Sequence, residues 1–159
     1  MDVSTAIASK RDERRYADRS VSAEHVERIL DAGRLSGSSR NTQNWEFVVV
    51  ETAQDALADA VYAPENVRTA GLVVAIVGSA FPFDAGRCAQ NMMLAAWELG
   101  VVSCPNGIRD ADAAATICGG EVKMILSFGY PPKPRTERTA EEWSASANRK
   151  PLSEIVRRV

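Results

Sequence analysis

The sequence is poor in the residues that build metal centres and disulfide frameworks. Its 159 residues include three cysteines and one histidine. The cysteines lie 16 and 14 residues apart with no CxxC pair, which argues against a disulfide framework and a zinc site. His25 stands among Glu24, Glu27 and Arg28, a pattern typical of a solvated helix face, so histidine-based catalysis is disfavoured. We therefore expect no metal site.

Long apolar runs and an excess of positive charge are also missing. The longest apolar stretch, Ala70–Val77, is far shorter than the roughly 20 residues of a membrane helix, and the N-terminus lacks a signal-peptide core. The net charge is -2, which disfavours general binding to nucleic acid or an anionic membrane. The length favours one domain over residues 1–159. We expect a cytoplasmic protein with no nucleic-acid or membrane partner.

The common phosphate, zinc and hydrolase motifs are absent as well. The chain contains no GxGxxG, GxxxxGK[ST], HExxH or GxSxG. It does contain two cation-rich ends: five basic residues fall within positions 10–19 and seven within 132–159, whereas positions 41–131 hold four basic and ten acidic residues. If the ends meet in space, they form an anion site. The alternative is that these charges are ordinary solvated side chains.

Hydrophobic periodicity and capping residues predict an α+β protein. Helices are predicted over residues 3–11, 22–35, 54–61, 84–99, 110–118 and 152–158, and strands over residues 45–50, 72–77 and 122–128. Ser22 and Asp84 are the expected N-caps of two helices, and Gly100 is the expected end of the second. That second helix is apolar almost all round, which indicates burial in the core or at a subunit interface. Residues 131–150 are expected to form an extended arm.

Three short polar segments have the chemistry of a cofactor site. Arginine can bind two phosphate oxygens at once, and neutral hydroxyl and amide groups can recognise the edge of a planar ring without adding charge. The cationic segments contain Lys10, Arg11 and Arg14 near the start and Arg149 and Lys150 near the end; the neutral segment contains Ser38, Ser39, Asn41 and Gln43. Each segment alone is a weak signal.

The order and spacing of these segments resemble those of the FMN-dependent nitroreductase family. Residues 10–16 (KRDERRY) resemble the family's RRSxRxF, and residues 37–47 (GSSRNTQNWEF) resemble its PSxxNxQPWxF. Residues 84–100 resemble its central helix, residues 129–131 its GYP turn, and residues 148–156 (NRKPLSEIV) its closing RxPLxEIV. The resemblance covers nearly the whole chain in the family's order.

The resemblance implies a mostly antiparallel sheet surrounded by helices, in a domain-swapped homodimer with FMN at the interface. The groups expected to contact the phosphate and ribityl chain are Lys10, Arg11, Arg14, Arg149 and Lys150. The groups expected to line the flavin are Ser38, Ser39, Asn41 and Gln43 from the partner chain, Asn106 and Gly107 near flavin N5, and Asn66 near the pyrimidine edge.

The resemblance also implies a function. NADPH or NADH would give a hydride to FMN, and a nitroaromatic, quinone or other flat acceptor would then be reduced in ping-pong fashion. No catalytic side chain is expected, because the flavin carries the chemistry. Two alternatives stay open: a flavin-binding carrier or sensor of the same fold, and a scaffolding dimer that has lost the flavin.

The chain departs from the family pattern at three positions. Gly37 and Asn44 replace prolines, which predicts a looser turn around residues 38–43. Asp12 stands where serine is common and would repel a phosphate. We therefore expect a nearby cation to compensate Asp12, or its carboxylate to turn away.

Overall fold

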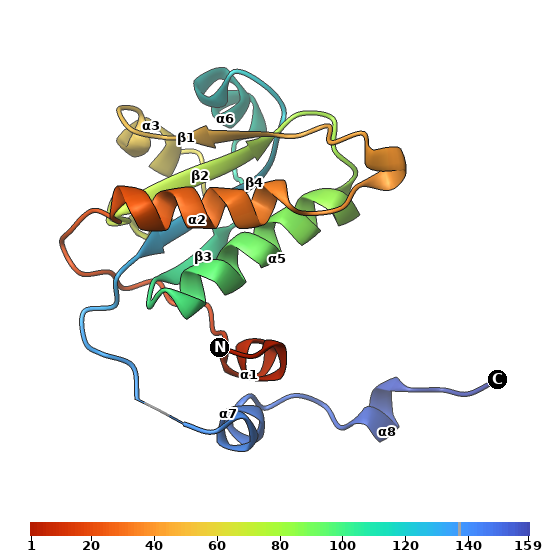
Figure 1. The fold of residues 1–159 in the computed structure, drawn as a ribbon. Coiled ribbons are helices and arrows are strands. Elements are labelled where there is room, and N and C mark those ends of the chain that lie inside the picture. The colour runs from red at the N-terminus through yellow and green to blue at the C-terminus, as the bar shows by residue number, and fades with distance from the viewer. Residues whose placement is uncertain (137) are drawn as a thin grey trace.

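The computed structural model describes residues 1–136 and 138–159 (Figure 1). Its helices are α1 (Val3–Ser9), α2 (Ala23–Arg34), the 3₁₀ turn η1 (Ser39–Asn41), α3 (Gln54–Ala58), α4 (Pro64–Arg68), α5 (Pro82–Glu98), α6 (Ala111–Cys118), α7 (Ala140–Ser146) and α8 (Leu152–Ile155). Its strands are β1 (Glu46–Val49), β2 (Leu72–Val77), β3 (Val102–Asn106) and β4 (Val122–Gly129). They form one four-stranded antiparallel sheet in the order β1-β2-β4-β3. The α+β class is confirmed.

The sheet is covered on both faces. Strand β2 is buried along its whole length, as its continuous apolar run predicts. Successive strand side chains point to opposite faces, so Val74 and Ile76 pack on the side of α2 and α5, while Val73 and Ala75 pack on the side of α3, α4 and α6. Figure 1 shows α2 and α5 lying side by side across one face of the sheet, and α3 and α6 on the other.

Helix α5 is the central helix, and Gly33 lets α2 approach it closely. A Cβ at Gly33 would come within 2.2 Å of the Met92 side chain on α5. The helix ends before Gly100, which has φ +74°, as predicted. The prediction that Asp84 caps α5 was wrong. The helix begins two residues earlier, because Pro82 suits the first helical position, and Asp84 is buried in the first turn.

The C-terminal arm, residues 131–159, contains more helix than the sequence interpretation allowed. Helix α7 interrupts the expected extended stretch, because Thr139 and Glu142 form a reciprocal capping box at its start. The predicted terminal helix ends at Ile155. Every residue from Asn148 to the C-terminus is exposed, and the arm projects past the body of the molecule (Figure 1).

Two elements and one side-chain environment were not foreseen. Strand β3 and helix α4 had no predicted counterpart; β3 contains Pro105, which an edge strand tolerates because one side of its ladder is free. His25 is half-buried and its Nδ1 lies 2.9 Å from the Tyr130 hydroxyl, so it is not simply a solvated residue. The three cysteines are buried and unpaired, in agreement with the absence of a disulfide framework.

Candidate cofactor site

The cationic N-terminal segment runs along the β3 edge of the sheet. Asp12 pairs with Ser103 as an isolated parallel bridge, and the Glu13 N–H donates to the Ser103 carbonyl oxygen at 3.1 Å. Arg14 is exposed beside Cys104. Burial raises the pKa of the Cys104 thiol, and the Arg14 charge partly opposes that effect. The segment predicted to bind phosphate therefore shares one sheet edge with the strand that leads to Asn106 and Gly107.

Two of the predicted phosphate ligands already have partners in this chain. The Lys10 ammonium forms an ion pair with the Asp12 carboxylate, one of the two arrangements expected for Asp12. The Arg11 guanidinium donates to the carbonyl oxygens of Ala8, Lys10 and Trp143 at 2.7, 2.9 and 2.7 Å. Arg11 thus joins α1 to α7, a role that the sequence interpretation missed, because its partner lies 132 residues away.

Three other predicted cations have no acidic partner in the part of the chain that the structure describes. Within residues 1–136 and 138–159, no carboxylate lies within ion-pair distance of Arg14, Arg149 or Lys150. Arg149 donates locally to the Ala147 carbonyl oxygen at 3.1 Å. Arg149 and Lys150 lie between α7 and α8, on the arm that projects past the body (Figure 1). Among the described residues, no hydrogen bond or ion pair joins either of them to the segment of residues 10–14.

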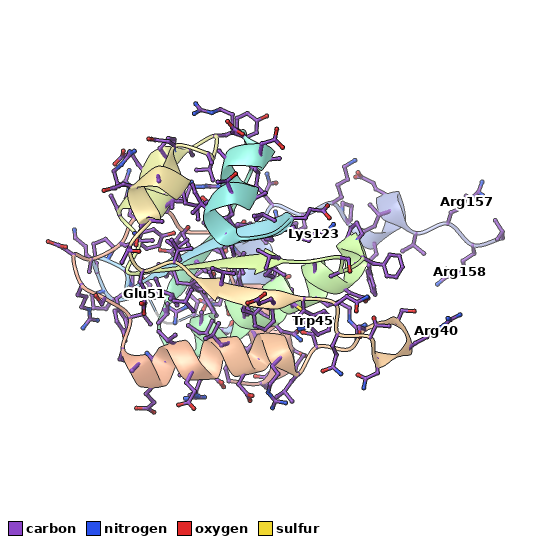
Figure 2. The ribbon with its side chains drawn as sticks, turned by 90° about the horizontal axis from the view of Figure 1, so that it is seen from above. Arg40, Trp45, Glu51, Lys123, Arg157 and Arg158 are labelled. Atoms are coloured by element: carbon purple, nitrogen blue, oxygen red, sulfur yellow. The ribbon has the colours of Figure 1, made fainter. Side chains whose placement is uncertain are left out.

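The loop of residues 38–43 holds an unusual backbone. Arg40, Asn41 and Gln43 have φ values of 54°, 55° and 51°, a region that costs free energy for residues other than glycine. Among the hydrogen bonds that hold this shape, the Ser38 Oγ accepts from the Gln43 N–H at 2.9 Å, and the Ser39 N–H donates to Asp84 at 3.3 Å. Figure 2 shows the Arg40 side chain pointing away from the body. Such stored strain is common in ligand-binding loops.

This loop and the N-terminal cations lie at different levels of α5. The loop is anchored at Asp84, in the first turn of the helix, whereas the Lys10 Nζ lies 3.4 Å from the Met93 sulfur. At 1.5 Å of rise per residue, those two anchors are about 14 Å apart along the helix axis. The structure thus keeps Ser38, Ser39, Asn41 and Gln43 apart from the cationic segment of the same chain.

The end of β3 combines a buried amide with an exposed glycine. The Asn106 Nδ2 donates to the Ser127 Oγ at 3.0 Å, and its Oδ1 is buried with no hydrogen-bond partner among the described residues. Gly107 is exposed, and its carbonyl oxygen accepts from the Tyr62 N–H at 3.0 Å. Asn66 is half-buried in α4, which packs near β3. These three predicted residues lie in one region, although the Asn106 side chain points into a buried network.

That buried network includes a residue that the sequence interpretation did not assign to the site. The Tyr16 hydroxyl lies 2.9 Å from the Ser127 Oγ, behind Arg14 and β3. Burial raises the pKa of Tyr16 to about 12, partly offset by the Ser127 hydrogen bond. The Ser103 Oγ is also buried without a partner in the described part of the chain. The only available signal was that residue 16 occupies the aromatic position of the first motif.

Comparison with solved structures defines the class of protein. A nitroreductase family protein from Clostridium difficile 630 superimposes with a TM-score of 0.83 at 25% identity, covering 99% of this chain and 98% of that one. A nitroreductase from Desulfovibrio desulfuricans, solved in complex with FMN, gives a TM-score of 0.80 at 26% identity, covering 98% and 96% of the two chains. The fold is therefore a nitroreductase fold.

The sequence comparisons then give the family. The Nitroreductase family model matches residues 7–75 and 78–130, so the chain belongs to the nitroreductase family. A relative from Archaeoglobus fulgidus that carries the name of an NADH dehydrogenase/NAD(P)H nitroreductase is 29% identical in an alignment 144 residues long that covers 79% of this chain and 83% of that protein. Family and fold together indicate an oxidoreductase. No helix among the described residues is long and apolar enough to cross a membrane, and those residues form no cluster suited to a metal ion.

Proposed function

We propose that this protein is an FMN-dependent NAD(P)H oxidoreductase of the cytoplasm, with residues 1–159 forming one flavin-binding domain. The observation that carries the proposal is the β3 edge, where Arg14, which has no carboxylate partner among the described residues, lies close to the strand that ends at Asn106. Family membership and the FMN complex of the relative from D. desulfuricans support the choice of cofactor.

The residues at this edge are chemically suited to FMN. Arg14 offers a guanidinium with no carboxylate partner among the described residues, and a guanidinium can bind a phosphate through two parallel hydrogen bonds. The buried Oδ1 of Asn106 and Oγ of Ser103 have no hydrogen-bond partner among the described residues, so both atoms retain unused hydrogen-bonding capacity there. Bound FMN supplies the redox chemistry, taking two electrons from NADH or NADPH and passing them to a flat acceptor such as a quinone or nitroaromatic.

The chain's own residues would then bind and orient the FMN. Arg14, with Arg149 and Lys150, is proposed to hold the phosphate, while Lys10 neutralises Asp12 so that the carboxylate does not repel it. Arg11 secures the arm through the Trp143 carbonyl oxygen and so acts indirectly on the phosphate site. Asn66, Asn106 and Gly107 are proposed to face the ring system. No side chain is needed as an acid, base or nucleophile.

A second copy of the chain is part of the proposal. The loop with Ser38, Ser39, Asn41 and Gln43 is anchored about 14 Å along α5 from the contact between Lys10 and Met93, and a partner's loop would complete the site. Apolar side chains are exposed at both places where a partner would sit: Phe81 and Phe83 beside the loop, 63% and 75% exposed, and Leu152 and Ile155 on α8, 73% and 61% exposed. We therefore propose a homodimer with FMN at its interface.

The test is a titration of the purified protein with FMN, followed by addition of NADH or NADPH without oxygen. We expect a flavin absorption spectrum that bleaches on reduction and recovers when a quinone is added. Arg14→Ala should weaken FMN binding by about tenfold or more, because a charge-assisted phosphate contact is lost. Arg34→Ala, an exposed arginine on α2, is the matched control and should bind FMN normally.

Two outcomes would contradict the proposal in different ways. A protein that binds FMN but does not bleach with either pyridine nucleotide would favour the carrier or sensor function. A protein that takes up no FMN at any concentration would show that the cationic clusters are ordinary surface charges.

A further inference from the structure

A second concave site lies away from the β3 edge. A cavity of about 760 Å³ separates the first part of the arm from α1 and the C-terminal end of α5. That volume is in the range of small-molecule sites in proteins. None of the twelve residues assigned to the FMN site by the sequence interpretation lines it. The cavity therefore needs an explanation of its own.

The walls combine aromatic rings with positive charge. The side chains that give the cavity its chemistry are Trp97, Tyr130, Trp143, Arg19, Arg135 and Arg138. Among the described lining residues there is no carboxylate, although the protein as a whole is acidic. Met1 also lines the cavity, and the charge of its N-terminal amine is paired with Glu98 at 2.8 Å.

The three guanidinium groups are held in place by the rings. Arg135 and Arg19 lie 3.7 Å from the ring centroids of Trp97 and Tyr130, and Arg138 lies 5.0 Å from that of Trp143. A guanidinium stacked on a ring keeps its N–H groups at its edge, where they can bind a carboxylate. The cavity thus presents pre-positioned donors rather than freely moving side chains.

Arg135 has a donor that the described part of the chain does not use. Its Nη2 donates to the Trp97 carbonyl oxygen at 2.6 Å, whereas its buried Nη1 has no hydrogen-bond partner. Burial lowers the pKa of Arg135, with the charge of Glu13 as a smaller opposing influence. An unpaired, partly desolvated cation is costly, and an anion beside it would offset that cost.

We propose that this cavity binds a small aromatic carboxylate, with Arg135 receiving the carboxylate and the half-buried Trp143 and Tyr130 rings contacting the aromatic body. The carboxylate matches the bidentate geometry of a guanidinium, and the ring matches the apolar wall. The site is distinct from the proposed flavin site, because the two share no lining residue.

Benzoate is a suitable first ligand, and the three tryptophans provide the readout. Trp97 and Trp143 line the cavity, whereas Trp45 lies next to β1 and does not line it. We expect benzoate to shift the indole N–H signals of Trp97 and Trp143 saturably in a ¹H–¹⁵N NMR titration at constant ionic strength. The Trp45 signal should stay in place. Benzamide, the neutral analogue, should bind about tenfold more weakly because it lacks the charge.

Variants test which arginine matters. Arg135→Gln should weaken benzoate binding by about tenfold, and Arg138→Gln by a smaller factor, because its guanidinium lies farther from its ring. Arg138→Gln keeps the test valid if loss of Arg135 unfolds the arm. The matched control is Arg34→Gln, which makes the same change of charge on α2 and should leave benzoate binding unchanged.

Several outcomes would overturn the inference. If benzoate and benzamide shift the tryptophan signals equally, the cavity does not recognise the charge. If inorganic phosphate and benzoate shift them equally, the cavity does not recognise the aromatic ring. Equal weakening by Arg34→Gln and Arg135→Gln would indicate a general electrostatic effect. Loss of benzoate binding in the presence of FMN would show that the cavity is not a separate site, whereas failure to bind FMN leaves the benzoate result unaffected.

Discussion

In the body of the molecule, residues 21–130, both faces of the sheet are packed with fully buried side chains, whereas none of the described residues of the arm is buried. The body is held by apolar contacts along β2, β4 and α5. The arm is held by polar anchors: Arg135 and Arg11 donate to the carbonyl oxygens of Trp97 and Trp143. Figure 2 shows Arg157 and Arg158 on its free end. The body is therefore stabilised by its own internal packing, whereas the apolar side chains of the arm stay exposed and available to contact another surface.

The largest effect should come from the body. Phe128→Ala removes a fully buried ring from β4 and should lower the free energy of unfolding by about 3–5 kcal/mol. Leu152→Ala on α8 is the control; it should change that free energy by less than about 0.5 kcal/mol at protein concentrations too low for association. Urea denaturation followed by circular dichroism measures both. Equal losses would remove the distinction between body and arm.

A smaller effect is expected where the N-terminal segment packs against the body. A Cβ at Gly129 would lie 2.6–2.8 Å from atoms of Tyr16, so Gly129→Ala should cost about 1–3 kcal/mol in unfolding free energy. Gly86→Ala is the matched control, because no atom lies within 4 Å of its Cβ position on α5. It should stabilise the protein by about 0.5–1 kcal/mol. Destabilisation by both substitutions would contradict the packing argument.

Tyr16 should make the stability depend on alkaline pH. Burial raises its pKa in the folded protein to about 12, above the ordinary value of 10.0. Its contribution is therefore fully present below pH 10 and is lost as the pH rises towards 12, by up to about 2 kcal/mol. Unfolding measured from pH 9 upward should show this loss in the wild-type protein and a smaller loss in Tyr16→Phe. Identical pH profiles would exclude the effect.

The smallest effect on global stability should come from Arg11, the N-terminal residue that anchors the arm. Arg11→Ala removes three hydrogen bonds to carbonyl oxygens but should cost only about 1 kcal/mol in global stability, because water replaces them. The local effect should be clearer: amide hydrogen exchange in α7 should accelerate, while exchange in β2 stays slow. Arg34→Ala should alter neither. Faster exchange in both elements would mean that arm and body unfold together.

Local signals were enough to predict much of the body. The cap at Ser22, the apolar run of β2 and the glycine after α5 each act through neighbouring residues, so the sequence shows them directly. Strand β3 was missed because its five residues include Pro105 and the polar residues Ser103 and Asn106. It is stabilised by pairing with β4, which lies farther along the chain. Helix α7 carried a visible capping box that the sequence interpretation overlooked.

The candidate site likewise contains features that were predicted from the sequence and features that were not. The resemblance to the nitroreductase family identified Arg14 and Gly107 as candidates, and their segments lie at one sheet edge. Neutralisation of Asp12 by a nearby cation was one of the two arrangements expected for its carboxylate. The sequence interpretation did not anticipate that Arg11 would bind the arm, or that Asn106 would turn into a buried network, because both depend on partners that meet only in the folded chain.

The three buried cysteines can serve as probes of local opening in different parts of this molecule. Cys88 lies on α5, Cys118 on α6 and Cys104 on β3, so one thiol marks each layer of the body and the edge that carries the candidate site. Burial raises the pKa of all three thiols, and only an exposed thiolate reacts quickly with a thiol reagent. The labelling rate of each cysteine therefore reports how often the layer around it opens. The arm has no cysteine, so its motions do not affect these rates.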